Sequence, residues 1–381
     1  MSFDTKLFSA KLTSVLGQFA TSIEKVSLET SIPVHRLKVL LEGKTEPSGD
    51  EVLILADYFK CDYRFFISNE RLTAYEQTEK LFRAHADELD GSDRWLIQEF
   101  LFLCDAEQQL QDALHKSRPN TPALTSKTRS WRQQGALAAA KIRRHLGIMP
   151  KSIHTDIFKD IRSLGIHIFR RPLKNAKISG VFIRHPIAGP CILINGSEDF
   201  YRQRFSAAHE AAHAILDHGE EASISFKWSN HDRSEIRANA FASAFLLPSE
   251  ILRILPDPNA WTNEDAIKWC HKLKVNAQTL AIALERAKRL KTSSSQRISK
   301  IKVPRIDKDD PELNNEFSVR GHDQLKLLVA RGLSRYFVQL AIDAYQNEFV
   351  SFARLCEILL SSEAETREIM ELYGVRSSHA S

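Results

Sequence analysis

The chain has 381 residues, of which 43% are hydrophobic and 27% charged, and its formal net charge is +5. This composition is typical of a globular protein of two or three domains, and no apolar run is long enough to span a membrane. The first residues mix charged with apolar side chains, which argues against a secretory signal. Five cysteines at irregular spacing argue against a disulfide framework and a zinc ribbon, so we expect a cytoplasmic protein without a membrane partner.

The N-terminal segment is predicted to form short amphipathic helices, two of which are joined by a brief turn. A helix that begins near Ser22 reaches a turn at residues 30–32. A second helix begins at Pro33, a favoured first helical position, and ends at Gly43. In a helix-turn-helix, the start of the second helix faces base edges and phosphates. The candidate DNA-binding residues are Val34, His35, Arg36 and Lys38.

Residues 8–68 resemble the lambda-repressor/XRE type of helix-turn-helix, including the stretches EGKTEPS and VLILADYFKCDYRFFIS. Three positions depart from the family pattern: Ile23 replaces a frequent Gln, Ser31 replaces the turn Gly, and the acidic Glu42 is displaced by one place. Residues 1–60 carry seven Lys/Arg and eight Asp/Glu, so this segment is close to neutral. The resemblance implies a partnership with DNA, and a degenerate protein-docking module is the alternative.

Helices are expected from 71 to 118, and the prolines of SRPNTPALTS mark a linker. Two further helices end at Gly147 and Gly165 and precede three β-rich runs, IHIFRR, SGVFIR and CILIN. Residues 126–177 carry thirteen Lys/Arg against two acids, and a second basic segment covers 286–308. Such segments can hold nucleic acid or form a solvated basic face.

The next predicted helix contains the sequence RQRFSAAHEAAHAILDHG, which has an HExxH motif. His209 and His213 lie four residues apart and therefore project from one helix face, where two imidazoles can hold one metal ion. Glu210 lies next to the first ligand, placed to take a proton from water. Zinc also needs a third protein ligand and an open position. The alternative is an alanine-rich core helix with histidines at its rim.

A second helix, SEIRANAFASAFLLP, can supply the third ligand. Glu235 lies 22 residues after His213, near the first turn of this helix, and an apolar stripe would pack the helix on the first one. Other acids and histidines are rivals for this role, although His218 points off the ligand face and the two glutamates after Gly219 fall in a loop. The rivals are His218, Glu220, Glu221, His231 and Asp232.

The ordered motifs ISGVFIR, CILIN, RQRFSAAHEAAHAILDH and EIRANAFASAFLLP resemble the ImmA/IrrE family of gluzincin-like metallopeptidases over roughly 130–290. The resemblance implies that His209, His213 and Glu235 bind Zn²⁺ and that Glu210 is the general base. A donor for the oxyanion is also needed. The candidates are His218, His231 and Arg237. His218 can equally cap or pack the end of its helix.

The remaining sequence is predicted to be helical after a Ser/Lys-rich linker. The C-terminal helices can pack on the peptidase-like domain, mediate a homodimer or regulate access to the metal. The expected fold class is α+β and mainly helical, with an all-α N-terminal domain, a zincin-like centre with a small β-sheet, and a helical tail. The expected parts are a helix-turn-helix domain at 1–70, a helical linker region at 71–125, a metallopeptidase domain at 126–290, a flexible linker at 291–310 and a helical C-terminal domain at 311–381.

The combination of the two resemblances implies a zinc-dependent endopeptidase that regulates transcription. Its protein substrate would be a repressor or an antitoxin-like partner, and its N-terminal domain would bind DNA. One alternative is a DNA-binding regulator whose peptidase-like domain is a sensor and cuts nothing. Another is a component of a toxin–antitoxin or phage-defence system.

Overall fold

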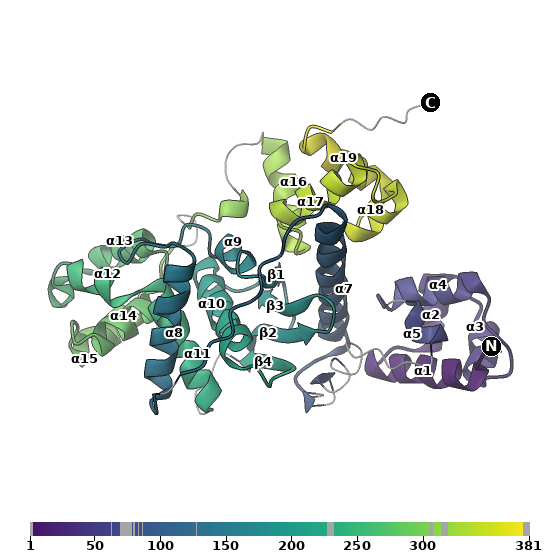
Figure 1. The fold of residues 1–381 in the computed structure, drawn as a ribbon, viewed down its shortest axis with the longest axis horizontal. Coiled ribbons are helices and arrows are strands. Elements are labelled where there is room, and N and C mark those ends of the chain that lie inside the picture. The colour runs from purple at the N-terminus through teal and green to yellow at the C-terminus, as the bar shows by residue number, and fades with distance from the viewer. Residues whose placement is uncertain are drawn as a thin grey trace. The chain divides into compact units, whose positions relative to one another are not determined.

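The computed structural model describes most of the chain (Figure 1). The described residues are 3–61, 63–68, 78, 81–82, 84–85, 87–126, 128–226, 232–304, 308–313 and 319–375. The chain divides into two compact units, the first of which comprises Met1–Ala106, Leu173–Asn175 and His185–Ile187. The second unit holds the remainder, including the HExxH motif. Within the described ranges, no helix combines the length and the apolar character needed to cross a bilayer.

The first unit consists of short helices around a core rich in phenylalanine. Those whose bounds the structure describes are α1 (Thr5–Gln18), α2 (Ile23–Thr30), α3 (Val34–Leu41), α4 (Gly49–Tyr58), α5 (Arg64–Ile67) and the first part of α7 (Gly91–Ala113). The Ser22 side chain caps α2 by accepting a hydrogen bond from the Lys25 backbone, and Ser31 ends the helix in the left-handed conformation. The two helices predicted on either side of a turn are therefore present.

The second unit contains a four-stranded mixed sheet. Its strands are β1 (His167–Arg171), β2 (Ile178–His185), β3 (Gly189–Asn195) and β4 (Ala222–Phe226), in the order β1-β3-β2-β4. Strand β1 pairs with β3 in parallel, and β4 pairs with β2 antiparallel. The sequence patterns indicated only the first three strands. The short stretch ASISF is held as an edge strand by its pairing with β2, which its own composition does not predict.

Helices make up most of the second unit, and the mainly helical α+β class is confirmed. They are the last part of α7, α8 (Trp131–His145), α9 (Ile157–Arg162), α10 (Phe200–Leu216), α11 (Arg233–Leu246), α12 (Ser249–Ile254), η1 (Pro258–Ala260), α13 (Asn263–Leu273), α14 (Ala277–Arg286), α15 (Thr292–Ser299), η2 (Pro311–Leu313), α16 (Val319–Ala330), α17 (Arg335–Gln346), α18 (Phe352–Ile358) and α19 (Glu363–Leu372). Helix α15 lies within the stretch expected to be a flexible linker. It forms because Ile298 is fully buried against the core of the unit.

Helix α10 is buried along almost its whole length between the sheet and α11 (Figure 1). The Asp199 side chain caps its N-terminus by accepting a hydrogen bond from the Tyr201 backbone. Its alanines allow neighbouring elements to approach closely, and they belong to one core with Phe182, Ile192 and Phe241. The packing expected for a core helix and the histidines of the HExxH motif thus occur on the same helix.

Helix α11 packs against α10 on one side and α8 on the other. The contact with α8 depends on Gly135, because a Cβ atom there would lie 2.8 Å from the Phe241 backbone nitrogen and would also collide with the Arg237 carbonyl. A glycine at this position lets the two helix backbones come together. This packing holds in place the helix that carries Glu235.

Candidate metal centre

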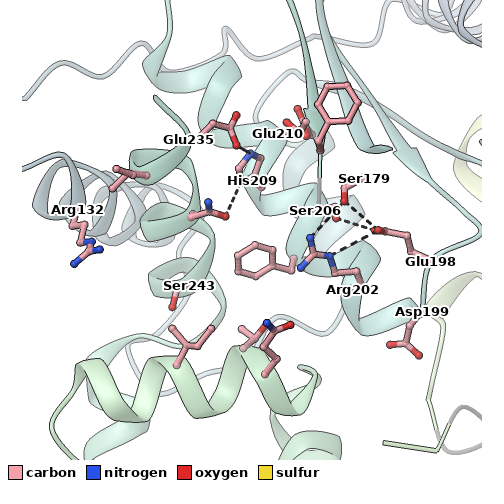
Figure 2. A pocket seen from close by; sticks show the side chains of 18 of the residues that line it. Arg132, Ser179, Glu198, Asp199, Arg202, Ser206, His209, Glu210, Glu235 and Ser243 are labelled. Carbon is pink, nitrogen blue, oxygen red and sulfur yellow. Dashed lines mark hydrogen bonds and ion pairs between the residues drawn. The ribbon is translucent and has the colours of Figure 1, made fainter. Parts of the chain in front are cut away.

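Three side chains converge where α10 meets the first turn of α11. The Nε2 atoms of His209 and His213 lie 3.1 Å apart. The Glu235 carboxylate faces both, with Oε2 3.4 Å from His209 Nε2 and Oε1 3.3 Å from His213 Nε2. Figure 2 shows Glu235 directed at His209 across the gap between the two helices. The antiparallel helix pair expected from the sequence therefore brings the three proposed ligands together.

These distances suit a small tetrahedral cation. Zinc binds imidazole nitrogen and carboxylate oxygen at about 2.0–2.2 Å, which places the ligand atoms of a tetrahedral site about 3.3–3.6 Å from one another. The separations of 3.1, 3.4 and 3.3 Å between the three side chains lie close to that range. The donor set of two imidazoles and one carboxylate is also that of a catalytic zinc site with one open position.

The other ring nitrogen of each histidine has a hydrogen-bond acceptor. His209 Nδ1 lies 3.2 Å from Asn239 Oδ1, and His213 Nδ1 lies 2.7 Å from Asp217 Oδ2. Arg237 in turn forms an ion pair with the other oxygen of Asp217. These acceptors favour the tautomer with hydrogen on Nδ1. Both Nε2 atoms then face each other and the carboxylate, where they can either take up a proton and donate to Glu235 or bind a cation.

The charges in this cluster shift the pKa values of its members. Burial acts to raise the pKa of Glu235, but hydrogen bonds from His209 and His213 outweigh it and lower the pKa to about 2. Burial acts to lower the pKa of His213, but the hydrogen bond to Glu235 and the charges of the surrounding glutamates raise it. The site therefore favours an ionised Glu235 and stabilises a positive charge next to it, which either a proton on an imidazole or a metal cation can supply.

Glu210 lies beside this cluster and is completely buried. Its carboxylate packs on Gly180 of β2, where an added Cβ atom would lie 2.6 Å from Oε1 and 2.9 Å from Cδ. Among the described residues, neither carboxylate oxygen has a hydrogen bond of regular geometry, and the Ser225 side chain lies near enough to act on the pKa of the carboxyl. Burial raises the pKa of this carboxyl, while His209 and His213 oppose the shift. A glutamate in such surroundings can exchange a proton closer to neutral pH than an exposed one.

A cleft of about 720 Å³ opens onto His209, Glu210 and Glu235. Its wall near the start of α10 contains Glu198, which accepts hydrogen bonds from Ser179 Oγ at 3.1 Å and Ser206 Oγ at 3.2 Å (Figure 2). The cleft is large enough for several residues of a peptide or for a small molecule. His209 and Glu235 of the convergent cluster therefore border the cleft, together with Glu210.

The structure gives other partners to two candidate oxyanion donors. Arg237 forms an ion pair with Asp217, and its Cζ atom lies 5.3 Å from the centroid of the Trp131 ring. His218 Nε2 lies 3.3 Å from the Leu124 carbonyl oxygen, consistent with the packing alternative for this histidine. Neither lines the cleft. The third candidate, His231, lies outside the described residues.

The rival metal ligands occupy other positions. Asp232 caps α11 by accepting a hydrogen bond from the Ser234 backbone. Glu220 approaches His213 from the Nδ1 side, at 4.0 Å, and so faces away from Glu235. The Glu221 backbone carbonyl accepts a hydrogen bond from Arg184 at the sheet edge. Of the described acids, Glu235 is the one that faces both Nε2 atoms.

The residues proposed to contact DNA all lie on α3 in the first unit. His35 and Lys38 are exposed, and Val34 is partly exposed. Arg36 instead forms a bidentate ion pair with Glu51, at 2.7 and 2.8 Å, and donates to the Glu46 carbonyl oxygen. Its guanidinium therefore binds side-chain and backbone groups of the first unit, which the sequence pattern did not indicate.

The second unit has the features of a metallopeptidase-like domain. These are the α+β fold, the helix with the HExxH motif and the glutamate on the following helix. Residues 161–285 match the family model described as Peptidase_M78, IrrE N-terminal-like domain. The match includes every residue of the convergent cluster, whereas the first helices and the C-terminal helices lie outside it. Neither the curated proteins nor the solved structures yielded a match to the chain.

Sequence reasoning assigned no role to Asn239, Asp217 or Gly180. The first two lie four residues after Glu235 and His213, respectively, so helical spacing alone could have placed them near the ligands. Gly180 lies on a separate strand, 30 residues before Glu210. No local pattern in the sequence links these two residues.

Proposed function

We propose that this protein is a zinc-dependent endopeptidase that regulates transcription in the cytoplasm by cleaving a repressor or an antitoxin-like partner. The convergence of His209 Nε2, His213 Nε2 and the Glu235 carboxylate beside the buried Glu210 carries this proposal. The match of residues 161–285 to a peptidase family model supports it independently.

His209, His213 and Glu235 would hold the zinc ion, with Asn239 and Asp217 orienting the two imidazoles. A bound zinc ion acts as a Lewis acid on the scissile carbonyl and acidifies water. The Glu210 carboxylate accepts a proton from the attacking water and delivers it to the departing amide nitrogen. Gly180 leaves the space in which this carboxylate sits.

The test compares the parent protein with Glu210→Gln on a repressor-type regulator encoded beside it. We expect both proteins to hold one equivalent of zinc. The variant should cleave about 10²–10⁴-fold more slowly, because general acid–base catalysis contributes on that order. Equal cleavage by the two proteins would overturn the role of Glu210. Full regulation by an inactive Glu210→Gln protein would favour the sensor alternative.

We propose in addition that the first unit binds DNA through α3. The exposure of His35 near its start and of Lys38 in its last turn supports this, whereas Arg36 would contribute by shaping the helix surface through Glu51. A shift assay with the DNA upstream of the gene tests the idea. Lys38→Gln should weaken binding and reduce its salt dependence, while Lys60→Gln, which removes an exposed ion pair elsewhere in the unit, should leave both unchanged. Absence of any shift would favour a protein-docking role.

A further inference from the structure

Two arginines line the cleft of the candidate metal centre and come from helices outside the HExxH pair. Arg132 lies in the first turn of α8, and Arg286 is the last residue of α14. Both belong to the lining that includes His209, Glu210 and Glu235. In Figure 2, Arg132 lies on one side of His209, and Glu198 and Asp199 lie on the other. The cleft therefore has two chemically distinct ends.

The two arginines at this end of the cleft have no carboxylate partner in direct contact among the described residues. In the part of the chain that the structure describes, neither Arg132 nor Arg286 forms an ion pair or a hydrogen bond with a carboxylate. Glu285, the nearest acid in sequence, accepts a hydrogen bond from Thr292 Oγ1 at 2.9 Å. Burial lowers the pKa of Arg286, the charge of Arg132 lowers it further, and the charge of Glu285 opposes the shift, so the two guanidinium groups repel each other with only partial compensation.

The acidic side chains at the opposite end of the cleft already have partners within the protein. Asp199 forms an ion pair with Lys308. Glu198 accepts hydrogen bonds from two serines and lies 3.9 Å from Arg202 Nε. A ligand that enters the cleft thus meets unmatched positive charge at one end and a satisfied polar network at the other.

One face of α14 connects the arginine end to the rest of the cleft. Gln278, Ile282 and Arg286 all line it, and their spacing of four residues places them in a row along the helix. Eight residues of helix span about 12 Å, the length of three to four residues of an extended peptide. This face offers a polar, an apolar and a cationic contact in succession.

We propose that Arg132 and Arg286 form a subsite for an aspartate or glutamate side chain of the protein substrate. Guanidinium groups bind carboxylates through paired hydrogen bonds, and a carboxylate between the two arginines would relieve their repulsion. The subsite rests on the proposed peptidase function and adds a selectivity to it. The substrate then carries an acidic residue a few positions from the bond that is cleaved.

The experiment uses the zinc-loaded full chain and a degenerate peptide library read by mass spectrometry. We expect Asp and Glu to be enriched at one position relative to the cleaved bond. In the double variant Arg132→Gln/Arg286→Gln, the ratio of kcat/KM for an acidic peptide to that for its amide counterpart should fall about 10-fold, because a charge-assisted hydrogen bond is lost. Arg132→Glu/Arg286→Glu should shift the preference towards Lys and Arg. Arg144→Gln, an exposed position of α8 outside the cleft, is the matched control.

A second measurement separates the subsite from the chemistry. Fluorescence anisotropy reports the binding of the same acidic and amide peptides to the zinc-loaded Glu210→Gln protein. Two results would overturn the subsite but not the peptidase function. One is cleavage without a preference for acidic residues, and the other is a preference that persists in the double glutamine variant. Acidic preference in binding without cleavage by the parent protein supports the subsite and overturns the peptidase. Neither binding nor cleavage of any library peptide overturns both.

Discussion

The Nε2 atoms of His209 and His213 lie 3.1 Å apart, although neither histidine needs the other as a hydrogen-bond partner. Their Nδ1 atoms are held by Asn239 and Asp217, so the two Nε2 atoms present lone pairs towards the same point. Glu235 adds a carboxylate oxygen to that point. Electron pairs that converge in a buried site repel one another unless a proton or a metal cation lies between them. This arrangement motivates the first prediction.

Removal of the Glu235 charge should abolish tight metal binding. Glu235→Gln keeps the size of the side chain but replaces a carboxylate ligand with a weak amide donor. We expect its zinc affinity to fall by at least about 100-fold, measured by competition with a chromogenic chelator. Glu264→Gln, on an exposed position of α13, is the control and should bind zinc like the parent. Unchanged affinity in Glu235→Gln would show that the glutamate is not a ligand.

A methyl group at Gly180 should impair activity more than stability. Gly180→Ala places a Cβ atom 2.6 Å from Glu210 Oε1, so the carboxylate must move from its place beside the histidines. We expect peptidase activity to fall at least about 10-fold with zinc content retained, since a displaced base transfers protons less efficiently. Gly219→Ala, where an added Cβ meets nothing within 4 Å, should be neutral. Full activity of Gly180→Ala would contradict the assigned position of the base.

The hydrogen bond from His213 to Asp217 should strengthen metal binding indirectly. Asp217→Ala removes the acceptor at 2.7 Å from Nδ1 and also frees Arg237. Loss of such outer partners weakens metal binding about 10–100-fold. Asp217→Asn keeps an oxygen acceptor without the charge, and its zinc affinity should fall between those of the parent and the alanine variant. Equal affinities for the two variants would indicate that the acceptor has no orienting role.

His154 should make the second unit less stable in mild acid. Burial lowers the pKa of this histidine below its ordinary value of about 6.5, against the opposing influence of Asp160 and with Arg143 adding to the shift. Below about pH 6.5, the unfolded chain therefore binds the proton more readily than the folded one, and the free energy of unfolding falls as pH decreases. Urea denaturation between pH 5.5 and 7.5 measures this slope. His154→Gln should flatten it, and an identical slope in the variant would assign the acid sensitivity to other groups.

A buried ion pair should anchor the segment that leads to the C-terminal helices. Arg170 Nη1 lies 2.6 Å from Asp310 Oδ2, and both side chains are largely buried. Asp310→Asn leaves the guanidinium without its charge partner and should cost about 3 kcal/mol of stability. The neighbouring Asp309, whose side chain is 71% exposed, pairs with Lys274, and Asp309→Asn should cost less than about 0.5 kcal/mol. Thermal unfolding of the two variants compares them directly, and equal shifts would refute the anchoring role.

Local patterns in the sequence determined the parts of the site that lie on one helix. The four-residue spacing of His209 and His213 follows from the period of an α-helix, and the alanines around them already indicated a closely packed helix. Short β-rich runs predicted three of the four strands, and proline and glycine marked several helix ends. These features depend on neighbours within a few residues, where chain geometry leaves few choices.

Tertiary structure alone decided which distant residues meet. The pairing with β2 makes a strand of Ala222–Phe226, and the burial of Ile298 makes a helix of a stretch that reads as a linker. Gly180 meets Glu210, and Arg36 turns to Glu51, because separate elements happen to pack there. Glu235 was one of several acids within reach in the sequence, and only the packing of α11 on α10 directs it at both histidines. Such contacts depend on the summed packing of the core, which no short stretch of the chain encodes.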